Sequence, residues 1–80
     1  MKIIDLKDIE NILSEVFNLK KKPKKIKELE QGDFKEWDSL GNFNLLIAIE
    51  EFYSVRFNSK EIINIRSVKQ ILYALNNKLK

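Results

Sequence analysis

The chain has 80 residues, a formal net charge of +3 and neither cysteine nor histidine. A single small domain of this length, here residues 1–80, buries a modest core but cannot also enclose a substrate cavity of roughly 300–1,000 Å³. The missing residue types exclude disulfides, thiolate nucleophiles, zinc sites of the usual kind and a histidine general base. We therefore expect a protein that is not an enzyme and that holds no metal.

Membrane and targeting signals are absent from the sequence. No apolar run approaches the ~18 residues of a membrane-spanning helix, and Met1-Lys2-Ile3-Ile4-Asp5 lacks the apolar centre of a signal peptide. We expect a cytoplasmic monomer with no transmembrane segment. All the basic residues except Arg56 and Arg66 are lysine. Because lysine, isoleucine and asparagine all have A/T-rich codons, either genomic bias or a selected basic surface explains the charge.

The first predicted helix runs from Leu6 to about Asn18, with Asp5 as its N-cap. Its apolar residues form one core-facing stripe made of Leu6, Ile9, Ile12, Leu13, Val16 and Phe17. The lysine run at 20–25, with Pro23 inside it, opposes continuation of the helix. The run is either a solvated loop or a patch for an acidic partner, a lipid headgroup or nucleic acid. Because no aromatic residues are interleaved with the lysines, we do not expect nucleic acid as a partner.

A long connection with little periodicity follows, up to Trp37. Apolar residues at Ile26, Leu29, Phe34 and Trp37 are expected to pin it to the core, since an unpinned loop of this length is unusual in a small domain. We interpret Trp37 as a structural anchor rather than a ligand-stacking residue. Gly32-Asp33 is typical of a turn.

The second predicted helix spans Ser39 to Tyr53 and has Asp38 as a favourable N-cap. Its buried stripe is expected to contain Leu45, Ala48, Ile49 and either Phe52 or Tyr53, with Leu40, Phe43 and Ile47 nearer the helix edge. Ser39 then lies exposed at the positive end of the helix dipole. That position favours a phosphate ester.

Two more helices are predicted in the last quarter of the chain. A short one runs from Lys60 to about Asn64, capped by Asn58 or Ser59, with Ile62, Ile63 and Ile65 covering the core. Ser67 and Gln70 have the spacing of a capping box and begin a helix that ends near Lys78. Its buried residues are expected to be Val68, Ile71, Leu72 and Leu75, with Tyr73 at the margin. The order of elements predicts an all-α, small four-helix bundle.

At Asp38-Ser39-Leu40, and in the helix that ends Glu50-Glu51-Phe52-Tyr53, the chain resembles the acyl carrier protein family, including its peptidyl and aminoacyl relatives. The version Glu36-Trp37-Asp38-Ser39-Leu40-Gly41 is similar to free-standing carriers of specialised pathways. The resemblance covers nearly the whole chain. It implies a bundle of acyl-carrier type, with three longer helices, a short third helix and a long loop between the first two.

The resemblance also implies a cofactor, a 4′-phosphopantetheine arm on Ser39 that makes the chain a phosphoprotein. The arm's thiol would hold an acyl or aminoacyl group as a thioester, in fatty-acid or secondary-metabolite biosynthesis. The implied partners are a phosphopantetheinyl transferase that uses coenzyme A, an acyl- or aminoacyl-loading ligase and an acyltransferase. Asp38 either helps to position the metal or the arm during attachment or is only an N-cap.

Contacts with partner enzymes are expected at Leu40, which flanks the attachment serine, and at Ile47. Charged residues of the docking face would be Glu50, Glu51 and Arg56. Fatty-acid carriers often have acidic residues where this chain has Gly41, Asn42 and Asn44, so we expect dedicated partners rather than general fatty-acid enzymes. Gly41 is also expected to weaken the helix start by up to ~1 kcal/mol relative to alanine and to leave the attachment serine mobile.

A second class of function stays open. The chain could be a small helical protein-interaction or nucleic-acid-binding domain that uses its lysine-rich surface and leaves Ser39 unmodified.

Overall fold

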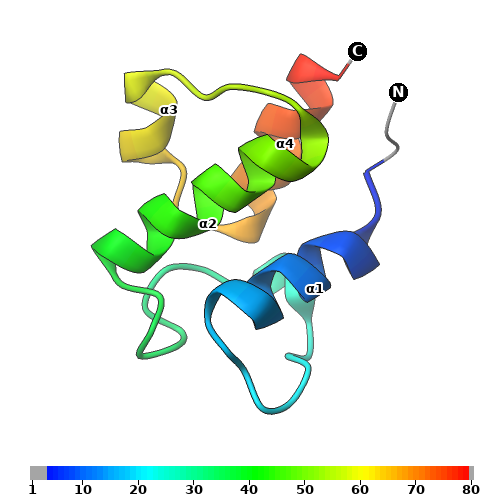
Figure 1. Ribbon diagram of the computed structural model, residues 1–80, viewed down its shortest axis with the longest axis vertical. Coiled ribbons are helices and arrows are strands. Elements are labelled where there is room, and N and C mark those ends of the chain that lie inside the picture. The colour runs from blue at the N-terminus through cyan, green and yellow to red at the C-terminus, as the bar shows by residue number, and fades with distance from the viewer. Residues whose placement is uncertain (1–3, 80) are drawn as a thin grey trace.

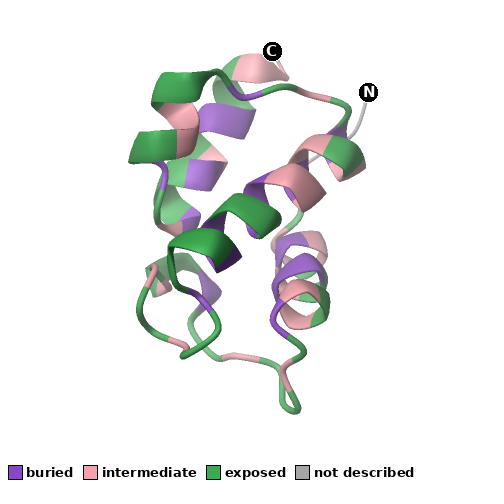
Figure 2. Cartoon of the chain, turned by 60° about the vertical axis from the view of Figure 1, so that its left-hand side comes forward, coloured by how far each residue is buried: buried purple, intermediate pink, exposed green. Residues whose placement is uncertain are grey.

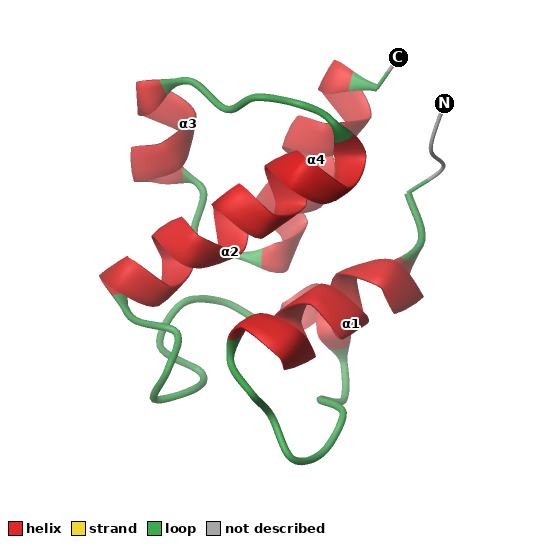
Figure 3. Cartoon of the chain, in the orientation of Figure 1, coloured by secondary structure: helices red, strands yellow, loops and turns green. Residues whose placement is uncertain are grey.

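The computed structural model describes residues 4–79, and its regular structure in this range is helical, without strands (Figures 1 and 3). The elements in chain order are α1 (Leu6–Val16), the 3₁₀ turn η1 (Ile26–Glu28), α2 (Ser39–Tyr53), α3 (Ser59–Asn64) and α4 (Val68–Lys78). The predicted all-α fold, a small helical bundle, is confirmed.

No helix among residues 4–79 combines the length and the apolar character needed to cross a bilayer.

The first helix begins where it was predicted and ends earlier. The Asp5 side chain accepts a hydrogen bond from the Lys7 N–H at 2.9 Å and caps the first turn. The helix ends at Val16 because Asn18 adopts a left-handed conformation with a φ of 51°. Asparagine tolerates this conformation better than most residues and commonly follows a helix end. The helix therefore stops before the lysine run begins.

The core lies where α1 packs on α2 and where η1 packs against α1 and α4 (Figure 2). Its completely covered side chains are Ile9, Leu13, Trp37, Leu45, Leu46, Ile49, Val68, Ile71 and Leu75. In α2, Tyr53 is buried and Phe52 half-buried, which settles the predicted choice between them; Ala48 is only half-buried. Leu72 in α4 is likewise half-buried, and Tyr73 is 73% exposed rather than at the margin of the buried face.

The long connection between α1 and α2 is pinned as predicted. Trp37 is fully buried, and its ring stacks on Phe17 with centroids 5.5 Å apart and on Phe34 at 6.3 Å. Ile26 is also buried. Gly32 turns the chain with a φ of 102°, a left-handed conformation that glycine adopts easily. The predictions of a Trp37 anchor and a Gly32-Asp33 turn are confirmed.

An unpredicted antiparallel bridge ties this connection to the start of α4, between Glu30 and Ser67. The Gln31 N–H donates to the Arg66 carbonyl at 2.7 Å, and the Val68 N–H donates to the Leu29 carbonyl at 2.9 Å. The loop before α2 and the segment after α3 therefore meet. This junction lies beside the first turn of α2, because Gln31, Ser39 and Arg66 line one surface hollow.

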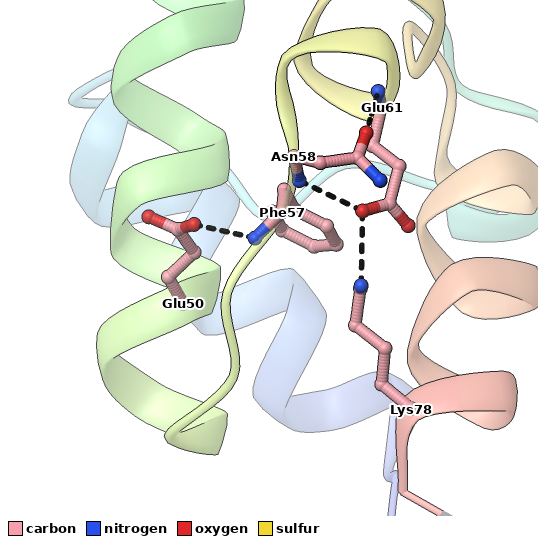
Figure 4. A network of polar contacts seen from close by, with 5 residues as sticks. All are labelled: Glu50, Phe57, Asn58, Glu61 and Lys78. Carbon is pink, nitrogen blue, oxygen red and sulfur yellow. Dashed lines mark hydrogen bonds and ion pairs between the residues drawn. The ribbon is translucent and has the colours of Figure 1, made fainter.

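The short helix α3 buries none of its residues, so the prediction that Ile63 covers the core is wrong. Ile63 is 62% exposed and Ile62 half-buried, whereas Ile65, just after the helix, is buried as predicted. A six-residue helix presents too narrow a face to bury both Ile62 and Ile63, which are consecutive. Polar contacts at its first turn hold it instead (Figure 4): Asn58 and Glu61 form a capping box, and Glu61 pairs with Lys78 at 2.9 Å.

The cap of α4 differs in detail from its prediction. The Ser67 hydroxyl accepts a hydrogen bond from the Gln70 N–H at 3.2 Å, as expected of an N-cap. The side-chain Oε1 of Gln70, however, accepts from the Arg66 N–H at 2.7 Å and from the Ser67 hydroxyl at 3.2 Å, not from the Ser67 backbone N–H as a capping box requires. The return contact of the capping box is thus shifted by one residue and fixes the backbone of Arg66.

Candidate functional site

Ser39 is the first residue of α2 and its side chain is exposed. Asp38 is the N-cap, and its Oδ1 accepts from the Gly41 N–H at 2.8 Å. The Ser39 hydroxyl makes no hydrogen bond to any residue between 4 and 79. The predicted exposed serine at a capped helix start is therefore present, and its oxygen is free to be derivatised.

Gly41 is buried against the loop that precedes the helix, and this corrects our view of its role. A Cβ built on Gly41 would collide with the backbone carbonyl of Glu36 and would lie 3.1 Å from Cε1 of Phe17. Only glycine permits this close approach. Gly41 thus seats the Asp38-Ser39 turn on the loop, and the expected mobility of the helix start has no support in this packing.

Asn42 is the one buried polar residue in the described core, at a position noted from the sequence only as one where fatty-acid carriers often have an acidic residue. Its Oδ1 accepts from the Trp37 indole N–H at 2.9 Å, and its Nδ2 donates to the Ile65 carbonyl at 2.7 Å. The first turn of α2 is consequently tied to the preceding loop on one side and to the end of α3 on the other. The backbone of Ser39, in the same turn, is therefore held in a fixed position as well.

A surface hollow of about 220 Å³ opens beside Ser39. Its lining comes from the loop before α2, from α2, from α3 and from the segment after α3: Gln31, Ser39, Asn42, Phe43, Ile62, Ile63 and Arg66. This lining contains no carboxylate and one cationic group. An anion attached at Ser39 would meet a guanidinium and no acidic side chain in the hollow.

Three large apolar side chains near Ser39 stay exposed: Phe43 at 44% and Ile63 at 62%, which line the hollow, and Leu40 at 68%, which follows Ser39 in the chain but does not line it. Leu40 and Phe43 belong to the first turns of α2 and Ile63 to α3. Exposed apolar groups that cluster beside a reactive position suit contact with another macromolecule. Leu40 is therefore available for the partner contact that the sequence predicted, with Phe43 and Ile63 in addition.

The other predicted contact residues gather elsewhere. Ile47, Glu50, Glu51 and Arg56 line a second hollow, of about 640 Å³, at the far end of α2. Ten residues separate Leu40 from Glu50, a rise of ~15 Å along the helix. The structure thus brings these four together and leaves Leu40 apart. Glu50 is also engaged within the chain, because its Oε2 accepts from the Phe57 N–H at 2.7 Å (Figure 4).

The lining of the Ser39 hollow offers a hydroxyl and a guanidinium and contains no carboxylate. The sequence has no histidine or cysteine, and a guanidinium does not act as a base in proteins. Within residues 4–79, no cluster of three acidic residues is placed to hold a metal ion. The hydroxyl, the positive end of α2 and the adjoining hollow together fit a covalently attached phosphodiester.

Sequence reasoning missed Asn42, Gln31 and Arg66. Asn42 carried a usable signal, since a polar residue inside the apolar periodicity of a helix is either exposed or hydrogen-bonded. Gln31 and Arg66 carried none, because their proximity to Ser39 depends on the bridge between two segments far apart in the chain.

Comparisons with protein-family models, with curated proteins and with solved structures find no match.

Proposed function

We propose that this chain is an acyl carrier protein, not an enzyme, that holds an acyl or aminoacyl group as a thioester on a 4′-phosphopantetheine arm attached to Ser39. The observation that carries the proposal is the exposed, unbonded Ser39 hydroxyl at the capped start of α2, beside a hollow without carboxylates. The sequence resemblance at Asp38-Ser39-Leu40 points to the same group.

The arm supplies what the chain lacks. With no cysteine in the sequence, the protein has no sulfur that can form a thioester, and the pantetheine thiol would provide it. In attachment, the Ser39 oxygen forms a bond to the phosphorus that carries pantetheine in coenzyme A. The pyrophosphate P–O bond breaks, adenosine 3′,5′-bisphosphate leaves, and the serine proton passes to a base on the transferase.

The chain's own part in this reaction is presentation. Asp38 holds the first turn through the Gly41 N–H, and Gly41 and Asn42 fix that turn to the core. Leu40, Phe43 and Ile63 offer exposed apolar contacts for the transferase and for the enzymes that load and remove the cargo. Several enzymes can then bind the segment around Ser39 in the same geometry.

Charge around the site supports dedicated partners of a specialised pathway. Arg56 shares the second hollow, at the far end of α2, with Glu50 and Glu51, whereas the hollow beside Ser39 is lined by Arg66 and no acidic group. A basic docking patch on a general fatty-acid enzyme would meet little complementary charge here. We expect the malonyl-loading enzyme of bulk fatty-acid synthesis to charge the holo protein poorly, and efficient charging in a thioester assay would contradict this specialisation.

The test is incubation of the purified protein with coenzyme A and a broad-specificity phosphopantetheinyl transferase, followed by intact-mass measurement. Wild type is expected to gain the mass of one phosphopantetheine, and Ser39→Ala to gain nothing. Ser59→Ala is a matched control, because Ser59 is also an exposed serine at the first position of a helix. It should be modified like wild type.

The competing function predicts a different outcome. The lysine run at 20–25 is exposed except for the half-buried Pro23. If it served nucleic-acid binding, the protein would bind DNA or RNA with a steep salt dependence and would stay unmodified. Salt-dependent binding without any mass gain would therefore replace the carrier proposal.

A further inference from the structure

We infer that Arg66 is the counter-ion of the phosphodiester at Ser39, and that it directs the arm across the hollow toward Ile62 and Ile63. This inference rests on the proposed function, since no phosphodiester exists at Ser39 without the arm. It adds a positioning residue that the attachment motif does not contain.

The geometry places the two residues on one hollow although they are far apart in sequence. Arg66 is fixed there by three contacts. Its carbonyl accepts from the Gln31 N–H at 2.7 Å, its own N–H donates to Gln70 Oε1 at 2.7 Å, and its Nε donates to the Ile63 carbonyl at 3.1 Å. The guanidinium is thus oriented before any ligand arrives.

The donors of Arg66 are only partly used. A guanidinium carries five N–H groups, and the Ile63 carbonyl occupies the one on Nε. In residues 4–79 the two terminal nitrogens have no hydrogen-bonded acceptor, and the ion pairs of this part involve Lys22 and Lys78 instead. A planar fork of free N–H groups matches the oxygens of a phosphodiester.

A cation beside Ser39 would offset the charge of its acidic neighbour Asp38. Attachment at Ser39 puts a monoanion next to the Asp38 carboxylate in sequence, and like charges at short range repel. Arg66 is the cationic group in the lining of the hollow. Glu30 shares an adjoining hollow of about 420 Å³ with Arg66 but forms no ion pair with it. Arg66 is consequently available to the phosphodiester.

A purely structural role for Arg66 explains only one of the contacts that its guanidinium can make. Its Nε contact satisfies a carbonyl at the end of α3, as basic residues near helix C-termini commonly do. That contact leaves the terminal nitrogens unexplained. It also predicts no change in the path of the arm when salt is added, whereas a counter-ion is screened by salt.

The lack of cysteine permits a direct test. In the holo protein the arm thiol is the single thiol, so a neutral thiol-reactive nitroxide labels only the arm. Broadening of amide resonances then reports which residues the arm visits. The samples are wild type, Arg66→Gln, Arg66→Lys and Lys69→Gln, each converted to the holo form and verified by intact mass. Lys69 is a matched control, because it is exposed nearby but does not line the Ser39 hollow.

In wild type and Lys69→Gln, broadening is expected to concentrate at Phe43, Ile62 and Ile63. Arg66→Gln should reduce it there roughly two- to fivefold, the population change that an exposed ion pair supplies. Arg66→Lys should keep most of the broadening at these residues. Salt near 1 M, where the screening length is about 3 Å, should lower the broadening in wild type to that of Arg66→Gln.

Equal broadening in wild type and Arg66→Gln, or broadening that salt leaves unchanged, would overturn the inference alone. Failure of wild type to gain the arm's mass would overturn the proposed function and, with it, the inference.

Discussion

Single residues in the first turn of α2 decide whether Ser39 is held in place. Gly41 and Asn42 follow it closely, and each is specified by a neighbour outside the helix. The attachment motif alone does not reveal this. Glycine after Leu40 looks like a weak helix former, and asparagine looks like a solvated residue, until the loop before α2 is seen to pack on both.

Replacing Gly41 with alanine is expected to destabilise the protein. Helix propensity would gain about 1 kcal/mol, but the added Cβ meets the Glu36 carbonyl, and backbone cannot move aside as a flexible side chain does. Overpacking of this kind costs roughly 1–3 kcal/mol and should outweigh the gain in propensity. Urea unfolding measures the difference. Asn44→Ala, at an exposed position of the same helix, should be neutral or slightly stabilising; a stabilised Gly41→Ala protein would refute this packing.

Removing the side chain of Asn42 should lower the free energy of unfolding by more than Gly41→Ala does. Asn42→Ala leaves the buried Trp37 indole N–H and the Ile65 carbonyl without their partners, at roughly 2–4 kcal/mol for the two groups. The same urea experiment, again with Asn44→Ala as the control, checks it. If Asn42→Ala lowered the free energy of unfolding by no more than an ordinary surface substitution does, these hydrogen bonds would not be what holds the first turn.

At the scale of elements, the sequence predicted the long helices well because each has a favourable cap, which α1 and α4 combine with one apolar stripe, whereas α2 is apolar on several sides. Asp5, Asp38 and Ser67 all cap the helices predicted from them. The end of α1 was placed two residues late, since the left-handed Asn18 was not foreseen. The short helix α3 was predicted but its burial was not, because six residues give a periodicity argument too little length.

The attachment of α3 to the bundle should depend on pH through Glu61 (Figure 4). Desolvation raises the pKa of this carboxyl, but the Asn58 N–H and the hydrogen bond and charge of Lys78 outweigh it, so the pKa is lower than usual. A carboxyl whose pKa is lower in the folded than in the unfolded chain stabilises the fold above the unfolded value. This contribution decreases as the pH falls through the folded pKa.

Glu61→Gln should therefore lose a few tenths to about 1 kcal/mol of stability at neutral pH. The difference from wild type should shrink as the pH falls below about 4, near and under the ordinary range of a glutamate. Thermal unfolding at a series of pH values measures it. Glu51→Gln is the matched control, an exposed glutamate in neither of the ion pairs described. A gap between Glu61→Gln and wild type that is constant with pH would rule out the ion pair as its source.

For the whole molecule, the fold class and the exposure of Ser39 could be predicted from the sequence, because both follow from local patterns. The composition of the site could not. Gln31 and Arg66 reach Ser39 only through the bridge between Glu30 and Ser67, a contact between segments without any shared periodicity. The residues expected on one docking face likewise divide between two ends of α2.

The central claim concerns one oxygen atom, that of the Ser39 side chain, and the state of this atom in the organism's own cells. The decisive measurement is the mass of the protein isolated from those cells, with peptide mapping of the segment that contains Ser39. A carrier is predicted to be found with a phosphopantetheine on that peptide, part of it bearing a cargo that hydroxylamine releases. Protein that is wholly unmodified at Ser39 under conditions in which it is made and used would contradict the account.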